Sequence, residues 1–473
     1  MPALFFALVC VSILLDFNGL YGQDAHEYLR QSRVFFDRLQ GFPPAPTGLG
    51  DTELAGGYPL AGALLRYFGL GAIRALQVVS WLAAAAALWM LELNLLVLSP
   101  GARPVSRWMF GLLGLMLAPY FLRAGITAMS DALGLAAALT ALFFGLRVLE
   151  LERHRDAVGF AIFAALAVTV RYALGILLAL PALALVLELL RVRKYGWLAA
   201  MAAAALLALL PLWWMKAGAM NSPLEHSLVR DWSVWNFFKR SFSQASGRVT
   251  YTLPNLLYLF FPVAHPGFCL LLPALLPLAR RTDAVRHTKR LLLLSMVLYL
   301  LLLGGLPHQN LRYLLPAYAI LLLLFFPAWD RFFAYGLYFF KRLTYALMAL
   351  ALACQLFFCA YTLLPTLARN RLEHQTATAL ATRLKSGDVV YAFDLDIALQ
   401  SYLPGISFRN LWMQRYEAFA PGSYLLFNEP ALRTQWAGQN PMLNWEYVRR
   451  HYELQKIQAL PAGWVLYRIV KPG

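Results

Sequence analysis

Long runs of apolar residues dominate the hydrophobic pattern of this chain. A bilayer core about 30 Å thick needs roughly 20 mostly apolar residues per spanning helix, and about eleven such stretches recur before residue 365. The pattern predicts spans near residues 2–17, 72–98, 107–122, 126–146, 157–171, 173–190, 197–216, 253–279, 291–306, 311–328 and 343–365. We therefore expect an α-helical, polytopic membrane protein.

The longest polar interruption among these stretches covers residues 17–71, and its first part has helical periodicity. Apolar and charged side chains fall on opposite sides, namely Tyr28, Leu29, Phe35, Phe36 and Leu39 against Arg30, Arg33, Asp37 and Arg38. The pattern predicts a helix lying in the headgroup plane. The stretch "GFPPAPTG" ends this helix, and "GGYPLAGALLRYFGL" predicts a second short interfacial segment.

From about residue 376 the pattern changes to short segments of strand type. The stretches "GDVVYAF", "ISFRNLW", "GSYLLFN" and "GWVLYRIV" predict strands, with helical patterns near 394–403 and 443–452. We expect two domains: a transmembrane catalytic domain over residues 1–365, which includes the first outer loop 17–71, and a small extracytoplasmic α/β domain over 366–473.

Composition agrees with a membrane location. Of the 473 residues, 60% are hydrophobic and 14% are charged, and the mean hydropathy is +0.58. The four cysteines all lie inside apolar stretches, so they are expected to pack as small hydrophobic residues rather than to form disulfides or a metal site.

The net charge of +17 comes largely from basic residues in every second turn. Lys and Arg are retained on the cytoplasmic side of a membrane, which predicts an orientation for the spans. The basic turns contain Arg103, Arg107, Arg147, Arg153, Arg155, Arg191, Arg193, Lys194, Arg280, Arg281, Arg286, Lys289, Arg290, Arg331, Lys341 and Arg342. The opening loop and the C-terminal domain are then outside. Anionic membrane lipids are the expected partners of this charge, and it gives no support to nucleic-acid binding.

Residues 1–16 have an alternative interpretation as a cleaved signal peptide, because this apolar run is short. The run lacks a basic start and a small-x-small cleavage site. Both interpretations leave the residues from 17 onward outside.

Acidic residues occur where the chain reaches the outer face. Asp24 and Glu27 are three residues apart at the start of the first interfacial helix, and Asp131 lies a few residues into a returning span. An ionisable group in a span is costly and is expected to face a cavity or a partner. The alternatives are structural: Asp24 and Glu27 also match a capping box, and Asp131 could cap its own helix.

Two further outward turns supply arginines. Arg171 and Tyr172 lie in "VTVRYALGILLALP", and His308 and Arg312 lie in "GGLPHQNLRYLLPAYAILLLL". Arg forks match phosphate oxygens bidentately, whereas Lys offers a point charge. Alternatively, Arg171 extends to lipid phosphate and His308 is an ordinary interfacial histidine.

Carboxylates and arginines on one membrane face suit transfer from a lipid-linked phosphate. The acid would take a proton from an acceptor hydroxyl, and the cation would stabilise the charge on the departing phosphate. A divalent cation, Mg²⁺ or Mn²⁺, shared by Asp24 and Asp131 could supply part of that stabilisation; no other cofactor is expected.

The chain resembles the GT-C superfamily of integral-membrane glycosyltransferases, and within it the bacterial branch similar to protein O-mannosyltransferases and the lipid A aminoarabinose transferase. The resemblance covers roughly residues 1–330 and rests on five stretches in order: "GQDAHEYL", "GGYPLAGALL", "MSDALGLAAAL", "VRYALGILLALPAL" and "HQNLRYLLPAYAILL".

The resemblance implies a polyprenyl-phosphate sugar donor and an inverting transfer to a lipid, glycan or protein acceptor. It also implies that Asp24 is the catalytic base, that Asp131 is the second outer acid and that Arg312 contacts the donor phosphate. The chain departs from the family in two places. Ala25 and His26 separate Asp24 from Glu27, where members often have adjacent acids, and Tyr58-Pro59-Leu60 replaces a His-Pro-Pro-like stretch.

The candidate catalytic residues are thus Asp24, Glu27 and Asp131, and the candidate substrate contacts are His26, Tyr58, Arg171, Tyr172, His308 and Arg312. The expected location is a bacterial inner membrane, with the active site and C-terminal domain on the periplasmic face. The alternatives are a transporter or flippase of lipid-linked saccharides, an O-antigen ligase or polymerase, and an envelope scaffold without catalysis.

Overall fold

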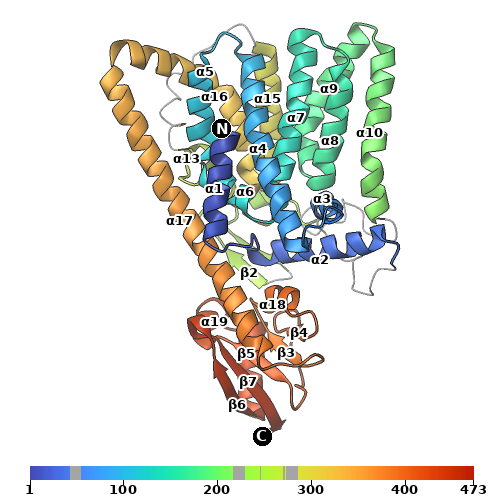
Figure 1. Ribbon diagram of the computed structural model, residues 1–473, viewed down its shortest axis with the longest axis vertical. Coiled ribbons are helices and arrows are strands. Elements are labelled where there is room, and N and C mark those ends of the chain that lie inside the picture. The colour runs from blue at the N-terminus through green and yellow to red at the C-terminus, as the bar shows by residue number, and fades with distance from the viewer. Residues whose placement is uncertain (43–54, 217–229, 245–246, 270–271, 273–285, 473) are drawn as a thin grey trace. The chain divides into compact units, whose positions relative to one another are not determined.

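The computed structural model shows two compact units (Figure 1) and describes residues 1–42, 55–216, 230–244, 247–269, 272 and 286–472. The helical unit comprises Met1–Gly19, Gln31–Phe242 and Thr250–Leu364, and the mixed unit comprises Leu20–Arg30, Ser243–Val249 and Pro365–Gly473. Two helices contribute residues to both units, α2 (Gly22–Leu39) and α17 (Lys341–Ala381), as do the short strands β1 (Ser241–Gln244) and β2 (Gly247–Thr250).

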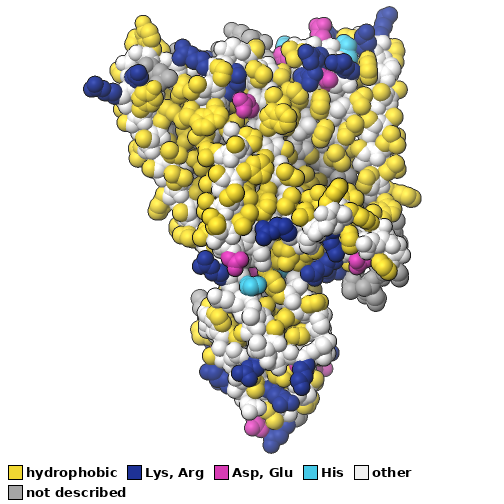
Figure 2. All heavy atoms as spheres, in the orientation of Figure 1, with side chains coloured by type: hydrophobic (Ala, Val, Ile, Leu, Met, Phe, Trp, Pro, Cys, Tyr) yellow, Lys and Arg dark blue, Asp and Glu magenta, His cyan; other side chains and the backbone are white. Residues whose placement is uncertain are grey.

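The remaining elements of the helical unit are helices. They are α1 (Pro2–Leu14), α3 (Gly57–Arg66), α4 (Ala72–Leu98), α5 (Pro104–Gly111), η2 (Leu112–Met116), α6 (Pro119–Ile126), α7 (Ser130–Leu151), α8 (Asp156–Val170), α9 (Leu174–Arg191), α10 (Tyr195–Lys216), η4 (Val234–Phe238), α12 (Asn255–Tyr258), α13 (Phe261–Ala264), α15 (Arg286–Gly305), η6 (Leu311–Leu314) and α16 (Leu315–Phe339). Figure 2 shows hydrophobic side chains over most of the visible face of this unit, with Lys and Arg gathered toward the helix ends.

Six of the described helices are long and apolar enough to cross a membrane: α4, α7, α9, α15, α16 and α17. The shorter apolar helices α1, α8 and α10 coincide with three further predicted spans. The predicted span 253–279 contains the short helices α12 and α13, and much of its second half lies outside the described residues. The prediction of a membrane protein built from apolar helices is confirmed, whereas the number eleven stays a prediction.

The membrane-type helices pack around a shared core. α4 lies against α7, α7 against α8, and α8 against α10 (Figure 1). Both α4 and α7 are rich in buried alanines, and small side chains let helix backbones approach closely. One polar contact fastens this pair, because buried Asn94 of α4 donates through Nδ2 to the carbonyl of Leu139 at 2.9 Å.

The predicted span 107–122 is broken into two helices. α5 continues into the π-helical turn η2, and the pair formed with α6 bends by 74°. Pro119 explains the break, because proline cannot continue a helical hydrogen-bond ladder. The carbonyls freed at the break find side-chain donors: Gln355 Nε2 donates to Leu117 O at 3.0 Å, and the Tyr318 hydroxyl donates to Gly114 O.

The mixed unit contains a five-stranded sheet with the strand order β4-β3-β5-β7-β6. Its elements are β3 (Val389–Ala392), α18 (Asp396–Tyr402), β4 (Ser407–Asn410), β5 (Tyr424–Phe427), α19 (Glu429–Trp436), α20 (Asn440–His451), β6 (Tyr452–Ala459), η7 (Pro461–Gly463) and β7 (Val465–Pro472). All four predicted strands and both predicted helices are present. The sequence interpretation missed α19 and β6.

Strand directions in this sheet are mixed. β3 pairs in parallel with both β4 and β5, and β7 pairs antiparallel with β5 and β6. The β3 residues Val390, Tyr391 and Ala392 are almost fully buried, as expected of a central strand covered on both faces. The carboxyl ends of the three parallel strands therefore meet at one edge of the sheet, where Asp394, Asp396 and Asn410 lie.

Replacing Gln355 by leucine should destabilise the helical unit. Gln355 is 2% exposed and its Nε2 also donates to Phe268 O at 2.7 Å. The substitution leaves Phe268 O without this donor, whereas Leu117 O keeps its contact with Cys359 Sγ at 3.1 Å. Each buried group left without a partner costs about 1–3 kcal/mol. Thermal unfolding in lipid nanodiscs should show a lower midpoint for Gln355→Leu than for the control Leu356→Ala, whose side chain is 49% exposed. Equal midpoints would mean that the break is held by other contacts.

The mixed unit should become more stable as the pH falls from 7 toward 4. Burial raises the pKa of Asp396 to about 6, while the hydrogen bond from Asn410 acts in the opposite direction. An unfolded aspartate titrates near 3.9. The folded state therefore binds the proton more tightly, and stability is gained as the pH drops through 6 and levels off below about 4.

The variant Asp396→Asn should remove this dependence and raise stability at pH 7 by about 1–3 kcal/mol, because the buried group is then neutral. Unfolding followed by tryptophan fluorescence between pH 4 and pH 8 checks the expectation. An unchanged slope of stability against pH in Asp396→Asn would contradict it.

Candidate functional site

A buried ion pair joins two of the outward turns of the helical unit. Asp131 is the second residue of α7 and is 3% exposed. Its Oδ1 accepts a hydrogen bond from Nη1 of Arg171, which follows α8. Arg312 Nη1 lies 3.9 Å from Asp131 Oδ2, so a second guanidinium faces the same carboxylate. The structure thus brings together Asp131, Arg171 and Arg312, three of the residues that the sequence singled out.

Local sequence explains how Asp131 and Arg171 meet. α8 ends at Val170 because Arg171 adopts an extended backbone conformation, which turns its side chain away from the helix axis. Gly134 lies one turn after Asp131 on α7, and a Cβ there would come within 3.2 Å of the Arg171 side chain. The missing side chain therefore leaves room for the arginine beside α7.

The turn that carries Arg312 is fixed by one hydrogen bond within the turn and by another from the short helix α12. The Arg312 amide donates to Asn310 Oδ1 at 3.2 Å, and the Tyr258 hydroxyl donates to Asn310 O at 2.6 Å. The Tyr313 ring lies beneath both guanidinium groups, with centroid distances of 4.9 Å to Arg171 and 5.7 Å to Arg312. An aromatic face of this kind favours cations.

The other predicted contacts of the helical unit lie in different surroundings. His308 is near this cluster, because its ring packs 6.1 Å from Tyr313 and its Nδ1 lies 2.9 Å from the Tyr251 hydroxyl. The Tyr172 hydroxyl is buried without a partner among the described residues. Tyr58 is fully buried, and its hydroxyl donates to Leu76 O at 2.8 Å. That bond fastens α3 to α4, and a direct substrate contact by Tyr58 stays a prediction.

The mixed unit holds the acidic start of the first outer loop. α2 begins at Gly22, so Asp24 lies inside the first turn rather than at the N-cap. Glu27 forms a bidentate pair with Arg30, with Oε1 2.6 Å from Nη2 and Oε2 2.8 Å from Nε. This pair gives Glu27 a structural role on α2. Its predicted catalytic role is not tested by this contact.

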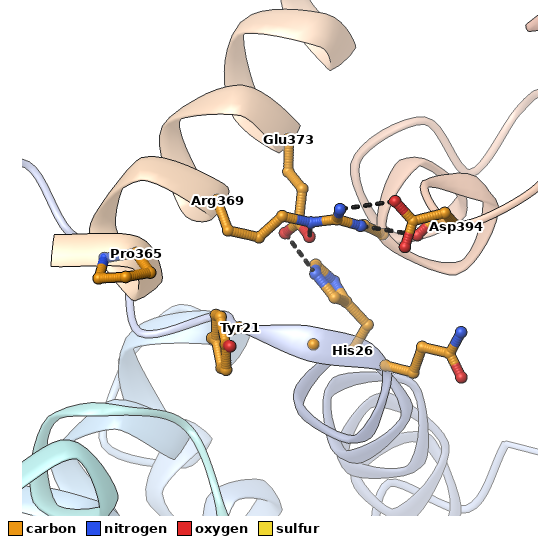
Figure 3. Close-up of a pocket in the computed structure, with 9 residues that line it drawn as sticks. Tyr21, His26, Pro365, Arg369, Glu373 and Asp394 are labelled. Atoms are coloured by element: carbon orange, nitrogen blue, oxygen red, sulfur yellow. Dashed lines mark hydrogen bonds and ion pairs between the residues drawn. The ribbon is translucent and has the colours of Figure 1, made fainter. Parts of the chain in front are cut away.

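His26 faces a pocket of about 310 Å³ inside the mixed unit (Figure 3). Its Nε2 lies 3.1 Å from Glu373 Oε2, and each side chain is 1% exposed. Arg369 donates through Nε to Glu373 Oε1 and through Nη1 to Asp394 Oδ2, both at 2.7 Å. Tyr21 and Pro365 complete this side of the pocket.

Sequence reasoning found His26 but missed its partners. Arg369 and Glu373 are four residues apart on α17, a spacing that places them on one helix face. That local signal was available in "LARNRLEHQ". The pairing of His26 with Glu373 spans 347 positions in the sequence, and no local pattern indicates it.

A metal ion does not fit the surroundings of Asp131. The carboxylate already faces the guanidinium groups of Arg171 and Arg312, and these would repel a divalent cation. Across the described residues, no group of three or more His, Cys, Asp or Glu side chains could hold a metal ion. Asp24 belongs to the mixed unit and Asp131 to the helical unit, so their sharing of one site stays a prediction.

Comparisons with known proteins give structural matches alone. No protein-family model matches the chain, and no curated protein matches it. Among solved structures, ArnT from Cupriavidus metallidurans in the apo state matches with a TM-score of 0.61 and 15% identity, over 98% of this chain and 97% of that chain. The same protein bound to undecaprenyl phosphate matches with a TM-score of 0.60 and 16% identity, over the same shares.

A third match is more partial. The arabinofuranosyltransferase AftD from Mycobacteria matches with a TM-score of 0.51 and 16% identity, over 99% of this chain and 40% of that chain. ArnT and AftD are both GT-C proteins. Identities this low establish the fold alone, and the expected similarity of fold is confirmed: this chain has the fold of ArnT over nearly its full length.

Proposed function

We propose that this chain is a membrane glycosyltransferase that moves a sugar from a polyprenyl-phosphate donor to an acceptor hydroxyl on the outer face of the membrane. The fold shared with ArnT, which has been solved with undecaprenyl phosphate bound, supports a lipid-phosphate donor. A lipid, a glycan or a protein is the acceptor class that the proposal includes.

The observation that carries the proposal is the buried cluster of Asp131, Arg171 and Arg312. One carboxylate faces two guanidinium groups, so these three side chains alone carry two positive charges and one negative charge. Arg171 makes the direct hydrogen bond, whereas the Arg312 contact is longer at 3.9 Å. An incoming phosphate would balance the second positive charge. Arg312 would donate two parallel hydrogen bonds to its oxygens.

The chemistry is a single displacement. The acceptor oxygen attacks the anomeric carbon of the donor sugar, the bond from that carbon to the phosphate oxygen breaks, and the configuration inverts. Asp24 takes the proton of the acceptor hydroxyl, and the polyprenyl phosphate leaves with the electron pair of the broken bond. Arg171 and Arg312 stabilise the charge that develops on that phosphate, and Asp131 holds both arginines in place.

A transporter or flippase of lipid-linked saccharides is less well supported. Transporters place charged groups at broken helices near the middle of the membrane. The break after η2 does not follow this pattern, because its carbonyls accept from Gln355 and Tyr318 of neighbouring helices. Asp131 instead lies at a helix start, as expected for chemistry at a membrane surface.

The proposed location is a bacterial inner membrane with the reaction on the periplasmic face. The turns after α7 and α9 lie at one end of the helical unit (Figure 1) and carry Arg153, Arg155, Arg191, Arg193 and Lys194. Basic turns are retained in the cytoplasm. The opposite end carries Asp131, Arg171 and Arg312, and it would then face outward.

Replacing Asp24 by asparagine should abolish sugar transfer while the protein still inserts and accumulates. The amide keeps the shape of the side chain and loses its basicity, and removal of a general base costs about 10²–10⁴-fold in rate. The test is mass spectrometry of envelope lipids and glycans from cells that lack the gene and carry either the wild type or the variant. The matched control is Asp37→Asn on the same helix, where the side chain is exposed. Near-normal transfer in Asp24→Asn would remove the catalytic assignment.

Replacing Arg312 by lysine should reduce transfer by about tenfold or more despite the preserved charge, because lysine cannot contact a phosphate bidentately. The control is Arg147→Lys. Arg147 also pairs with a buried aspartate, Asp156, at 2.8 Å, but at a distance from the cluster along α7. The apparent KM for the lipid donor, measured in vesicles with purified variants, should rise in Arg312→Lys only. Equal values in both variants would argue against phosphate contact by Arg312.

A further inference from the structure

The pocket beside His26 lies at a distinctive place in the sheet of the mixed unit. β3 pairs in parallel with β4 on one side and with β5 on the other, so the strand order reverses at β3. Ligands of open α/β sheets bind outside the carboxyl ends of the strands at such a reversal. Asp394 lies two residues after β3 and lines the pocket.

The backbone at this position is unusual. Asp394 has a φ of 73°, in the left-handed region that non-glycine residues rarely adopt. In this conformation Asp394 presents both its Oδ2 and its backbone oxygen to Arg369, each at 2.7 Å. Strained backbone of this kind is concentrated at ligand sites, where the surrounding structure holds it in place.

The side chains around the pocket are polar, and hydrogen bonds among them fix their positions. Glu373 accepts from Arg369 and contacts His26, and it is 1% exposed. His26 Nδ1 is buried without a partner among the described residues. Nearer the opening, the carboxylate of Asp394 is 42% exposed and the Gln23 side chain is exposed. Figure 3 shows the side chains of His26, Arg369, Glu373 and Asp394 pointing toward one another.

Charge decides which ligand class suits this space. Arg369 is matched by two carboxylates, Glu373 and Asp394, so the pocket offers no excess positive charge to a phosphate. What it offers is a set of carboxylate, guanidinium, amide and imidazole groups beside a tyrosine. Such a set can both donate to and accept from neighbouring hydroxyls, while the aromatic ring covers an apolar ring face. Binding of a sugar ring requires both kinds of contact, hydrogen bonds to its hydroxyls and an aromatic side chain against its apolar face.

We infer that this pocket binds a saccharide ring, and that the ring belongs to the sugar acceptor of the proposed transfer. The assignment to the acceptor rests on the proposed function. It narrows the acceptor from a lipid, glycan or protein to a molecule that already carries a saccharide. Gln23 and His26 line the pocket from the same turn of α2 that carries Asp24. A ring held there lies beside the first turn of α2, which carries the proposed base.

The test uses the full chain in lipid nanodiscs, prepared without glycoside detergents because these would occupy a sugar site. The probes are the methyl glycosides of glucose, mannose, galactose and N-acetylglucosamine, with inorganic phosphate as the competing anion. Saturation-transfer difference NMR suits the weak binding that is usual for single sugars. We expect saturation transfer from at least one glycoside in the wild type, without competition from phosphate.

Two variants locate the binding. Asp394→Asn and Gln23→Ala should each weaken glycoside binding about tenfold, because each removes a hydrogen-bonding group from the pocket. The matched control is Glu429→Gln, which removes a carboxylate from another arginine pair of the mixed unit, with Arg433. Thermal unfolding verifies that all variants are folded, and Gln23→Ala is the variant least able to disturb folding because Gln23 is exposed.

The outcomes separate this inference from the proposed function. Absence of saturation transfer in the wild type, displacement by phosphate, or equal binding by all variants would overturn the saccharide pocket. Asp24→Asn should retain glycoside binding and lose transfer. If the wild-type chain binds a glycoside but transfers no sugar, the saccharide pocket stands and the transferase function is refuted. If Asp394→Asn transfers sugar with an unchanged KM for the acceptor, the transferase function stands and the pocket is not the acceptor site.

Discussion

An ionised carboxylate cannot stay in an apolar helix bundle without a cation beside it, and Asp131 places that demand on the helical unit. Removing one partner of a buried ion pair costs about 3–5 kcal/mol, so the start of α7 and the end of α8 have to meet. Arg171 satisfies the demand directly, and Arg312 brings the turn before α16 to the same place. Three segments that are distant in sequence are thereby fixed at one end of the unit, where two guanidinium groups face one carboxylate. The proposed transfer of a sugar from a phosphate depends on those two guanidinium groups.

The broken span shows a second constraint that the lipid bilayer places on the chain. A helix interrupted at membrane depth exposes carbonyl groups that lipid cannot satisfy. Gln355, Cys359 and Tyr318 supply the donors, and in doing so they fasten α16 and α17 to the break. The short helix α6 can then end in the turn that opens α7. The polar contacts that repair the backbone and those that assemble the proposed donor site are therefore separate, although they lie in neighbouring segments of the chain.

The sequence predicted those features that depend on local composition. The span 72–98 coincides with α4, and all four predicted strands of the mixed unit are present, because apolar length and alternation are properties of short segments. Pro119 is a local signal that predicts a break in the span 107–122. The contact between His26 and Glu373 could not be predicted from local sequence, because the tertiary fold alone brings the two residues together. Residue type was enough to identify Asp131, Arg171 and Arg312 as candidates. Helix packing determines that these three side chains contact one another.

The π-helical turn η2 has a consequence for how this chain tolerates change. Five residues, Leu112–Met116, occupy a turn that an ordinary α-helix would make with fewer, so the turn accommodates an extra residue. Deleting a single residue there would convert the π-helical turn into a regular α-helical turn and would remove the local widening of the helix. Side-chain substitutions at these buried leucines would change only packing volume. The length of this segment, rather than the chemistry of its side chains, is therefore what homologous chains of this architecture would be expected to keep.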